Sequence, residues 1–249
     1  MTTSGKIVLQ RDGEREYDAY LARPAGAGPS AGPSAGPNSG PSIMIFTEMF
    51  GMARHNFELA DAYARRGFHA LVPNLYWRSP FPGELGYNEP DRSAAFARLA
   101  AFDVDAGGRD IVTAVKWLRD QPSANGKVFA LGFCAGGRMA FVAAARAGVD
   151  AAVSFYGMGI ANHADEFAAV QCPVHLHYGL KDPHIPQPEV DEVMRLAKGR
   201  SNIEVFLYAD AGHSFFNPIR PGYHAPSAKI AGERLEALLD RVCPVAATA

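Results

Sequence analysis

The 249-residue sequence has few cysteines, little excess charge and no long apolar run. Its three cysteines lie far apart, at positions 134, 172 and 243, so they suggest neither a disulfide framework nor a metal cluster. The 24 Lys and Arg residues against 26 Asp and Glu leave a net charge of −2, which provides no basic surface for a nucleic acid. No apolar run of about 18 residues predicts a membrane span. Because the first residues also lack the apolar core of a signal peptide, we expect a cytoplasmic protein without nucleic-acid or membrane partners.

Residues 24–42 form a segment of unusual composition. The stretch PAGAGPSAGPSAGPNSGPS holds five glycines and five prolines and has no apolar face to bury. It therefore predicts a flexible surface loop. A linker between two domains is the alternative, but the 23 residues before it are too few for a separate folded unit. With 48% apolar residues in the chain, we expect one domain over residues 1–249.

Short apolar runs alternate with amphipathic segments along the rest of the chain. Residues 6–10 and 15–22 are typical of a β-hairpin around an Asp-Gly pair. Further strands are predicted at 42–48, 69–75, 127–133, 151–156, 174–178 and 204–208, and helices at 56–66, 91–120 (one or two), 135–147, 189–197 and within 224–240. This alternation predicts an α/β protein with a mostly parallel central sheet and helices on both faces. Ligands bind such sheets at the carboxyl ends of the strands, so functional side chains should directly follow strands.

Cys134 lies in segment 132–136 (GFCAG), between a predicted strand and a predicted helix. The pattern G-x-C-x-G matches a nucleophile elbow with cysteine in place of serine. Its glycines give room for a sharp turn, and the free N–H groups of the following helix would favour a thiolate. A buried structural cysteine in a glycine-containing turn is the alternative for this motif alone. For Cys172 and Cys243 we expect structural roles.

Two other strand ends carry the partners that a nucleophilic cysteine needs. His213 follows the strand at 204–208, and Asp182 follows the strand at 174–178. An acid hydrogen-bonded to an imidazole fixes its tautomer and stabilises the imidazolium. Taken singly, Asp182 also fits an Asx turn, and His213 also fits an ordinary surface or core histidine. The order Cys134, Asp182, His213 is, however, the nucleophile–acid–base order of the α/β-hydrolase fold.

His175 and His177 share one face of a predicted strand, a spacing that a metal pair would need. No carboxylate or cysteine completes a ligand set beside them. We therefore expect neither a metal nor another cofactor.

Glu48 ends the otherwise apolar strand predicted at 42–48. A carboxylate buried there without a partner is costly, so it should have one. A solvated loop carboxylate is the alternative. The same turn should supply the second N–H group of an oxyanion hole, the first coming from the residue after the nucleophile. We therefore assign the oxyanion hole to the backbone N–H groups of Met49 and Ala135.

Taken together, these segments resemble the dienelactone hydrolase (carboxymethylenebutenolidase) family over essentially the whole chain, except the loop rich in Gly, Pro, Ala and Ser. The resemblance rests on residues 48–51 (EMFG), 72–76 (VPNLY), 102–107 (FDVDAG), 132–137 (GFCAGG), 155–157 (FYG) and 211–215 (AGHSF). It implies a triad of Cys134, His213 and Asp182. It also implies that a resting, protonated Cys134 passes its proton to Glu48 when the substrate binds.

The resemblance further implies a substrate-binding set, from which the sequence departs at two positions. The set comprises Arg92, Phe50, Phe96, Tyr156, Ser214 and Asn217. Arg92 matches the first of two arginines that hold a substrate carboxylate in the family, unless it is an ordinary helix-surface arginine. Asn217 stands in place of the second arginine, and Phe96 in place of a tyrosine. Losing one such contact weakens carboxylate binding by roughly 1.5–3 kcal/mol, which points to a less acidic substrate unless Arg220 compensates.

We therefore expect a monomeric hydrolase that opens a dienelactone-type enol lactone or cleaves a small ester through a thioester on Cys134. The resemblance places it in aromatic degradation. A general carboxylesterase of the same fold is one alternative. A thiol-dependent redox protein is another, although no resolving cysteine stands in C-x-x-C spacing. A non-catalytic binding protein is a third, which the complete triad disfavours.

Overall fold

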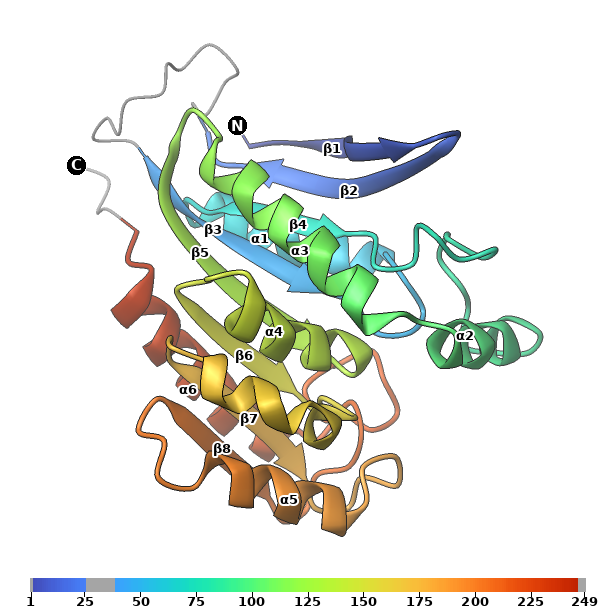
Figure 1. Ribbon diagram of the computed structural model, residues 1–249, viewed down its shortest axis with the longest axis vertical. Helices are drawn as coiled ribbons and strands as arrows, with labels where there is room; N and C mark the ends of the chain where they lie inside the picture. Colours follow the sequence, from blue (N-terminus) through green and yellow to red (C-terminus); the bar gives the residue numbers. More distant parts are fainter. Residues whose placement is uncertain (1, 26–38, 246–249) are drawn as a thin grey trace.

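An eight-stranded sheet forms the centre of the computed structural model, which describes residues 2–25 and 39–245 (Figure 1). Its strands are β1 (Thr3–Asp12), β2 (Arg15–Arg23), β3 (Gly40–Phe46), β4 (His69–Pro73), β5 (Ala124–Phe133), β6 (Ala151–Phe155), β7 (Val174–Gly179) and β8 (Ile203–Tyr208). They lie in the order β1-β2-β4-β3-β5-β6-β7-β8. β2 is antiparallel to β1 and β4, and all neighbours from β4 to β8 are parallel. The predicted mostly parallel sheet of an α/β-hydrolase fold is confirmed.

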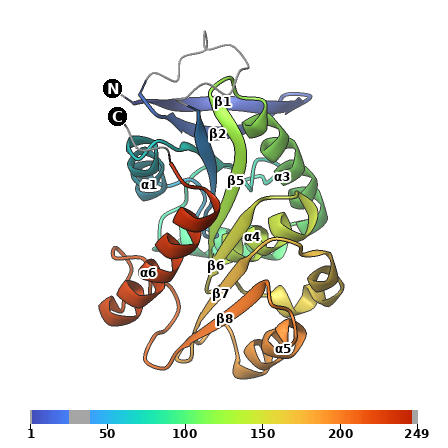
Figure 2. The ribbon, with the colours of Figure 1, turned by 90° about the vertical axis from the view of Figure 1, so that its left-hand side faces the viewer.

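Helices cover both faces of this sheet. They are α1 (Arg54–Arg65), α2 (Asp91–Ala100), α3 (Val104–Arg119), α4 (Ala135–Arg146), α5 (Gln187–Ala197) and α6 (Ala225–Val242), with a 3-10 segment, η1 (Ile160–Ala169), that the sequence pattern did not predict. Figure 2 shows α1 and α6 on one face and α3, α4 and α5 on the other. The helical stretch predicted at 91–120 is divided by Asp103, whose carboxylate caps α3 by accepting from the N–H groups of Asp105 and Ala106.

The loop predicted at 24–42 ends earlier than its composition indicated. Residues 26–38 lie outside the described residues, and residues 40–42 begin β3. Pro41 lacks the N–H group of a regular central strand, and the pairing of β3 with β5 shifts register between Gly40 and Ser42, which accommodates it. A Cβ at Gly40 would overlap the carbonyl oxygen of Gly67, so the close chain approach requires glycine there.

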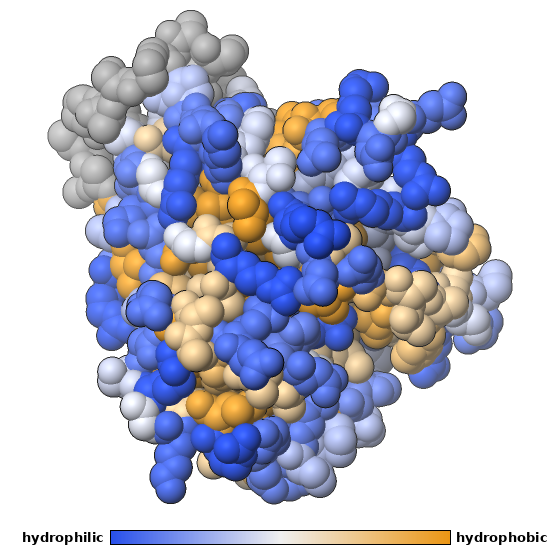
Figure 3. Space-filling view, viewed as in Figure 1, coloured by the Kyte–Doolittle hydropathy of each residue, from blue (hydrophilic) through white to orange (hydrophobic). Residues whose placement is uncertain are grey.

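The core lies along the central strands. Every residue of β3, β4, β6 and β7 is buried, because helices exclude water from both faces. Most of the face shown in Figure 3 is hydrophilic, with small hydrophobic areas between the polar side chains. Among the residues described, no helix combines the length and the apolar character needed to span a membrane.

The parallel pairing places the candidate site at one edge of the sheet. The carboxyl ends of β3, β5, β7 and β8 are followed by Glu48, Cys134, Asp182 and His213, respectively. Because parallel strands end at the same edge, residues far apart in sequence meet there.

The contact between α4 and the end of β3 allows a direct test of this packing. A Cβ at Gly136, in the first turn of α4, would overlap the carbonyl oxygen of Phe46 and lie 2.6 Å from that of Thr47. We expect Gly136→Ala to lower the free energy of unfolding by about 1–3 kcal/mol, because backbone atoms must move apart. Urea unfolding followed by circular dichroism measures this.

Gly5→Ala is the matched control, because a Cβ at Gly5 meets nothing within 4 Å. This variant should unfold at the same urea concentration as the parent protein. Equal stability of the two variants would show that α4 does not press against β3 as described.

Candidate active site

Cys134 lies in the turn between β5 and α4 in a strained backbone conformation. Its φ of 55° and ψ of −121° are unusual for a residue with a side chain. Such a conformation costs about 1–3 kcal/mol and persists only where the surroundings enforce it. Its N–H group donates to the carbonyl oxygen of Phe155 at 3.0 Å, and its Sγ lies 3.7 Å from Met158 Sδ. Cys134 is one of the residues that line a cavity.

The two glycines of the G-x-C-x-G pattern are required by contacts that the turn makes. A Cβ at Gly132 would overlap the carbonyl oxygen of Gly136 and approach the nitrogen of Gly137 to 2.9 Å. Gly136 in turn presses against the end of β3. These contacts place Cys134 immediately before the first turn of α4, where the helix has unpaired N–H groups and partial positive charge.

His213 and Asp182 form a hydrogen-bonded pair. The distance from His213 Nδ1 to Asp182 Oδ2 is 2.7 Å, and only 1% of the Asp182 side chain is exposed. Asp182 Oδ1 accepts from the backbone N–H of His184 at 2.8 Å, so the carboxylate is itself held in place. His213 and Cys134 line the same cavity, of about 500 Å³.

The surroundings raise the pKa of His213 from 6.5 to about 10. Burial by itself lowers this pKa, but the hydrogen bond with Asp182 and the interaction with the Cys134 sulfur outweigh it. The imidazole therefore keeps its proton at neutral pH.

Glu48 is a buried carboxyl group with long polar contacts. Ser214 Oγ lies 3.4 Å from its Oε1, and Arg220 Nε lies 3.9 Å from its Oε2. Burial raises the pKa of Glu48, while Arg220, then His213 and Ser214, oppose the rise. The alternative of a solvated loop carboxylate is therefore wrong. A buried carboxylate with a raised pKa takes up a proton more readily than one in water.

The turn after β3 is closed by a hydrogen bond from the Gly51 N–H to the Glu48 carbonyl oxygen at 3.1 Å. Met49, one of the two predicted oxyanion donors, lies in this turn and lines the cavity. Ala135, the other, is the first residue of α4 and directly follows Cys134. Their assignment to an oxyanion hole remains a prediction.

Four of the six residues predicted to bind substrate line the cavity that contains Cys134. They are Phe50, Arg92, Phe96 and Ser214. The first three come from the turn after β3 and from α2, and Ser214 directly follows His213. These segments belong to different parts of the chain, so the cavity wall is built by the fold.

The other two residues of that set lie outside the cavity wall. Tyr156 is fully buried, with its ring centroid 5.0 Å from that of His213, so it packs behind the imidazole. Asn217 lines a separate cavity of about 290 Å³, which shares Glu48 with the first. Tyr156 and Asn217 are therefore not among the residues that line the cavity at Cys134, and their role in substrate binding stays a prediction.

Arg220 reaches the cavity from the loop before α6. Its guanidinium carbon lies 3.9 Å from the ring centroid of Tyr87 and 5.1 Å from that of Phe50. Arg92, on α2, lines the same cavity, with its guanidinium carbon 5.8 Å from the ring centroid of Phe96. The cavity thus has two arginines, although Asn217 replaces the arginine expected by resemblance.

Sequence reasoning missed other side chains of the cavity, among them Tyr87, Met158 and His184. The ring centroid of His184 lies 4.9 Å from that of His213. Met158 contacts the nucleophile candidate through its sulfur. None of these residues belongs to a recognisable motif, and only the folded loops bring them to the site.

The remaining histidines and cysteines considered above lie apart from the cavity. His177 Nδ1 is 2.8 Å from the Tyr208 hydroxyl, and His175 Nε2 is 3.3 Å from Glu204 Oε1. Within residues 2–25 and 39–245, no cluster of three potential metal ligands is found. Burial raises the pKa of Cys172 to about 11 and that of Cys243 to about 12, which makes both thiols poor nucleophiles.

The fold and the site together define an α/β-hydrolase. A cysteine follows β5 in a tight turn before a helix, an acid follows β7, and a histidine follows β8. The model of the dienelactone hydrolase family matches residues 19–243. The chain therefore belongs to the dienelactone hydrolase family, and it is a hydrolase of the carboxylic-ester class.

Known proteins with similar sequences carry names that agree with this family. The chain is 33% identical over 236 residues to the carboxymethylenebutenolidase of Pseudomonas putida, covering 94% of each protein. It is 31% identical over 241 residues to carboxymethylenebutenolidase 1 of Cupriavidus pinatubonensis, covering 96% of this chain and 97% of the relative. The solved structure of a dienelactone hydrolase-like promiscuous phosphotriesterase from metagenomic libraries has the same fold. It matches with a TM-score of 0.77 and 24% identity over 97% of this chain and 99% of that one.

The contact between His213 and Asp182 predicts how the imidazole titrates. We expect Asp182→Asn to lower the pKa of His213 by about 1–3 pH units, because the charged acceptor is lost. A pH titration of the His213 ring signals by NMR measures this. Asp210→Asn is the control, because Asp210 lies in a nearby loop and pairs with Lys181 on the surface.

The same contact links protonation to stability. The pKa of His213 is higher in the folded chain, at about 10, than its ordinary 6.5. Its contribution to the free energy of unfolding is therefore fully present below about pH 6.5 and is lost as the pH rises towards 10. Asp182→Asn should weaken this dependence. A His213 midpoint near 6.5 in the parent protein would contradict the described pairing.

Proposed function

We propose that this hydrolase opens an enol lactone, or cleaves a small activated ester, through a thioester on Cys134. The observation that carries the proposal is that Cys134 and His213 line one cavity, while the buried Asp182 carboxylate contacts the His213 imidazole at 2.7 Å. Membership of the dienelactone hydrolase family supports it.

In the first half of the reaction, the Cys134 thiolate attacks the carbonyl carbon, and the carbonyl electrons move onto oxygen. The N–H groups of Met49 and Ala135 hold this oxyanion. When the carbonyl re-forms, the C–O bond of the lactone breaks and an enolate leaves, which needs less assistance than an alkoxide. The His213 imidazolium gives its proton to the departing oxygen.

The second half uses the imidazole that the first half has made neutral. Acylation removes the negative charge from the sulfur, and this charge is one cause of the raised pKa of His213. The neutral ring then takes a proton from water as the water oxygen attacks the thioester carbonyl. The thiolate leaves, and Asp182 stabilises the imidazolium that has formed.

Glu48 sets the protonation of the sulfur in this scheme. Burial raises the pKa of Glu48 and makes it a better proton acceptor. The Arg220 cation, whose Nε lies 3.9 Å from Glu48 Oε2, opposes this rise in pKa. A substrate carboxylate that binds Arg220 competes with Glu48 for this cation. Glu48 then takes the proton from a resting Cys134 thiol, and the thiolate forms when substrate is present.

Two arginines favour an anionic substrate. Arg92 and Arg220 enter the cavity from α2 and from the loop before α6, and aromatic rings lie beside both guanidinium groups. This arrangement suits a small, flat carboxylate. The apolar side chains of Phe96, Leu99 and Ile219 in the same cavity favour the second candidate, a general esterase for neutral substrates.

The role of the sulfur is tested by Cys134→Ala. We expect turnover of dienelactone and of p-nitrophenyl acetate to fall by at least about 1000-fold, while the melting temperature stays close to that of the parent protein. Mass spectrometry should detect an acyl group on Cys134 of the parent protein during turnover. Cys172→Ala should keep full activity, and retained activity in Cys134→Ala would remove the proposed nucleophile.

Substrate charge is tested by Arg92→Met and Arg220→Met. Each change should lower kcat/KM for an anionic dienelactone by about 10- to 150-fold, the equivalent of 1.5–3 kcal/mol. Arg92→Met should have little effect on a neutral aryl ester, and Arg195→Met, on the exposed face of α5, should alter neither reaction. Equal losses on charged and neutral substrates would favour the general esterase.

A further inference from the structure

Arg98 is a buried arginine on α2 that does not line the catalytic cavity. It is 3% exposed, and its side chain donates to backbone carbonyl groups. Nε lies 3.0 Å from the Met49 oxygen, which Nη2 also contacts, and Nη1 lies 2.7 Å and 2.8 Å from the Phe81 and Gly83 oxygens. The guanidinium carbon lies 4.2 Å from the ring centroid of Tyr76. This side chain therefore ties α2 to two other backbone segments, the turn at Met49 and the stretch 81–83.

The contact with Met49 matters because of its place in the turn after β3. The peptide group between Glu48 and Met49 contains the Glu48 carbonyl and the Met49 N–H. Its carbonyl oxygen accepts a hydrogen bond from the Gly51 N–H at 3.1 Å. The next peptide group carries the Met49 carbonyl, which Arg98 holds. The peptide groups on both sides of Met49 are thus fixed, so the direction of its N–H group is set.

The fit around this contact is tight. A Cβ at Gly51 would lie 2.9 Å from the Gly83 oxygen and 3.1 Å from Arg98 Nη2. The Phe50 oxygen also accepts from the Leu85 N–H at 2.9 Å, a second tie between the turn and the segment before α2. The turn therefore has little freedom to move while Arg98 remains in place.

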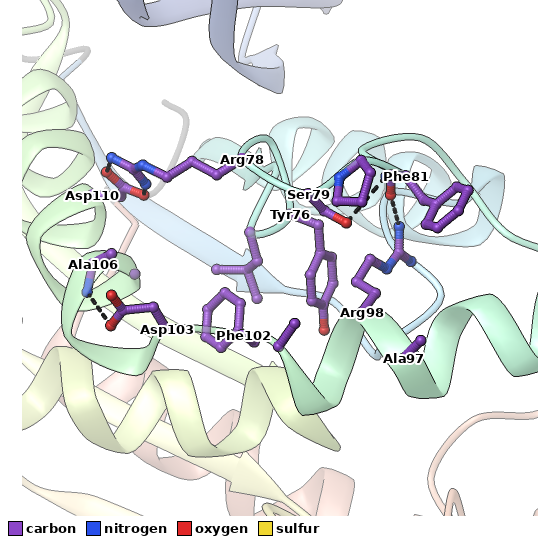
Figure 4. Close-up of a pocket in the computed structure, with 14 residues that line it drawn as sticks. Tyr76, Arg78, Ser79, Phe81, Ala97, Arg98, Phe102, Asp103, Ala106 and Asp110 are labelled. Carbon is purple, nitrogen blue, oxygen red and sulfur yellow. Dashed lines mark hydrogen bonds and ion pairs between the residues drawn. The ribbon is translucent and has the colours of Figure 1, made fainter.

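A second arginine nearby, Arg78, has a different kind of partner from Arg98. Arg98 and Arg78 lie at opposite ends of a cavity of about 270 Å³, shown in Figure 4. Arg78 pairs with the carboxylate of Asp110, whereas Arg98 points to the Phe81 carbonyl. Only backbone carbonyls and the Tyr76 ring surround the Arg98 guanidinium among the described contacts.

Helix α2 links this contact to substrate binding. Arg92 and Phe96 of α2 line the catalytic cavity, while Arg98 of the same helix holds the turn that carries Met49. The helix that presents the proposed anion-binding arginine is thereby tied to one side of the proposed oxyanion hole.

We propose that Arg98 is a positioning residue that holds the 48–51 turn so that the Met49 N–H points at the oxyanion. The inference rests on the proposed acyl transfer at Cys134. It requires that losing Arg98 slows reactions that form an oxyanion, and spares reactions of the same sulfur that form none.

Two reactions of Cys134, measured in the Arg98→Met variant, distinguish a loss of oxyanion binding from a general loss of reactivity. Acylation by p-nitrophenyl acetate builds negative charge on a carbonyl oxygen, whereas iodoacetamide alkylates the sulfur by displacing iodide from carbon. We expect the acylation rate to fall by about 10- to 1000-fold, with the loss in kcat rather than in KM, since removal of one oxyanion donor has effects up to this size. The alkylation rate should change less than about twofold.

Two further variants complete the test. Arg98→Lys keeps the charge but reaches fewer carbonyls, so its acylation rate should lie between those of Arg98→Met and the parent protein. It also serves if Arg98→Met does not fold. Arg78 lines the cavity of about 270 Å³ together with Arg98 but contacts no part of the 48–51 turn. In Arg78→Met, the ratio of the acylation rate to the alkylation rate should therefore equal that of the parent protein.

The outcomes are distinct. An equal loss of both reactions in the Arg98 variants would make the arginine a packing residue only and would overturn the inference, as would unchanged acylation. If the parent protein is alkylated at Cys134 but never acylated, the proposed function fails first, and the inference fails with it.

Discussion

The site depends on the close packing of the first turn of α4 against the carboxyl end of β3. Gly136 meets the carbonyl groups of Phe46 and Thr47 with no room for a side chain. This contact brings the turn that carries Glu48 and Met49 next to the strained turn that carries Cys134. Both turns would lie further apart if any larger residue stood at position 136. The strain at Cys134 is thus maintained by packing of backbone on backbone, which stabilises a conformation that the isolated segment would leave.

Three charged groups at the site, those of Glu48, Asp182 and Arg98, are buried, and each contacts a partner from another element. Asp182 holds His213, Arg220 faces Glu48, and Arg98 binds carbonyl groups of two separate segments. Burial strengthens these interactions because little water screens them. The same burial makes Glu48 easier to protonate and would discharge His213 if Asp182 and the sulfur were absent. The protonation of the site is therefore a property of the assembled cavity.

Much of the architecture and the central residues could be predicted because they leave local signals. The alternation of apolar runs and amphipathic segments indicated the parallel sheet, and G-x-C-x-G marked the turn at Cys134. The sequence was less informative about side chains whose position depends on loops. Tyr156 packs behind His213, and Asn217 lines another cavity, although both stand in or beside recognisable motifs. The start of β3 at Gly40 was obscured by a composition typical of a loop.

By itself, the sequence determined the order of strands and helices, the glycines around Cys134 and the chain order of the cysteine, the acid and the histidine. These follow from periodicity and from steric limits that act over a few residues. The tertiary structure decided that Arg220 enters the cavity, that Glu48 is buried beside it, and that Arg98 holds the Met49 carbonyl. Each of these depends on distances between segments far apart in the chain, and such distances are set only when the helices pack on the sheet.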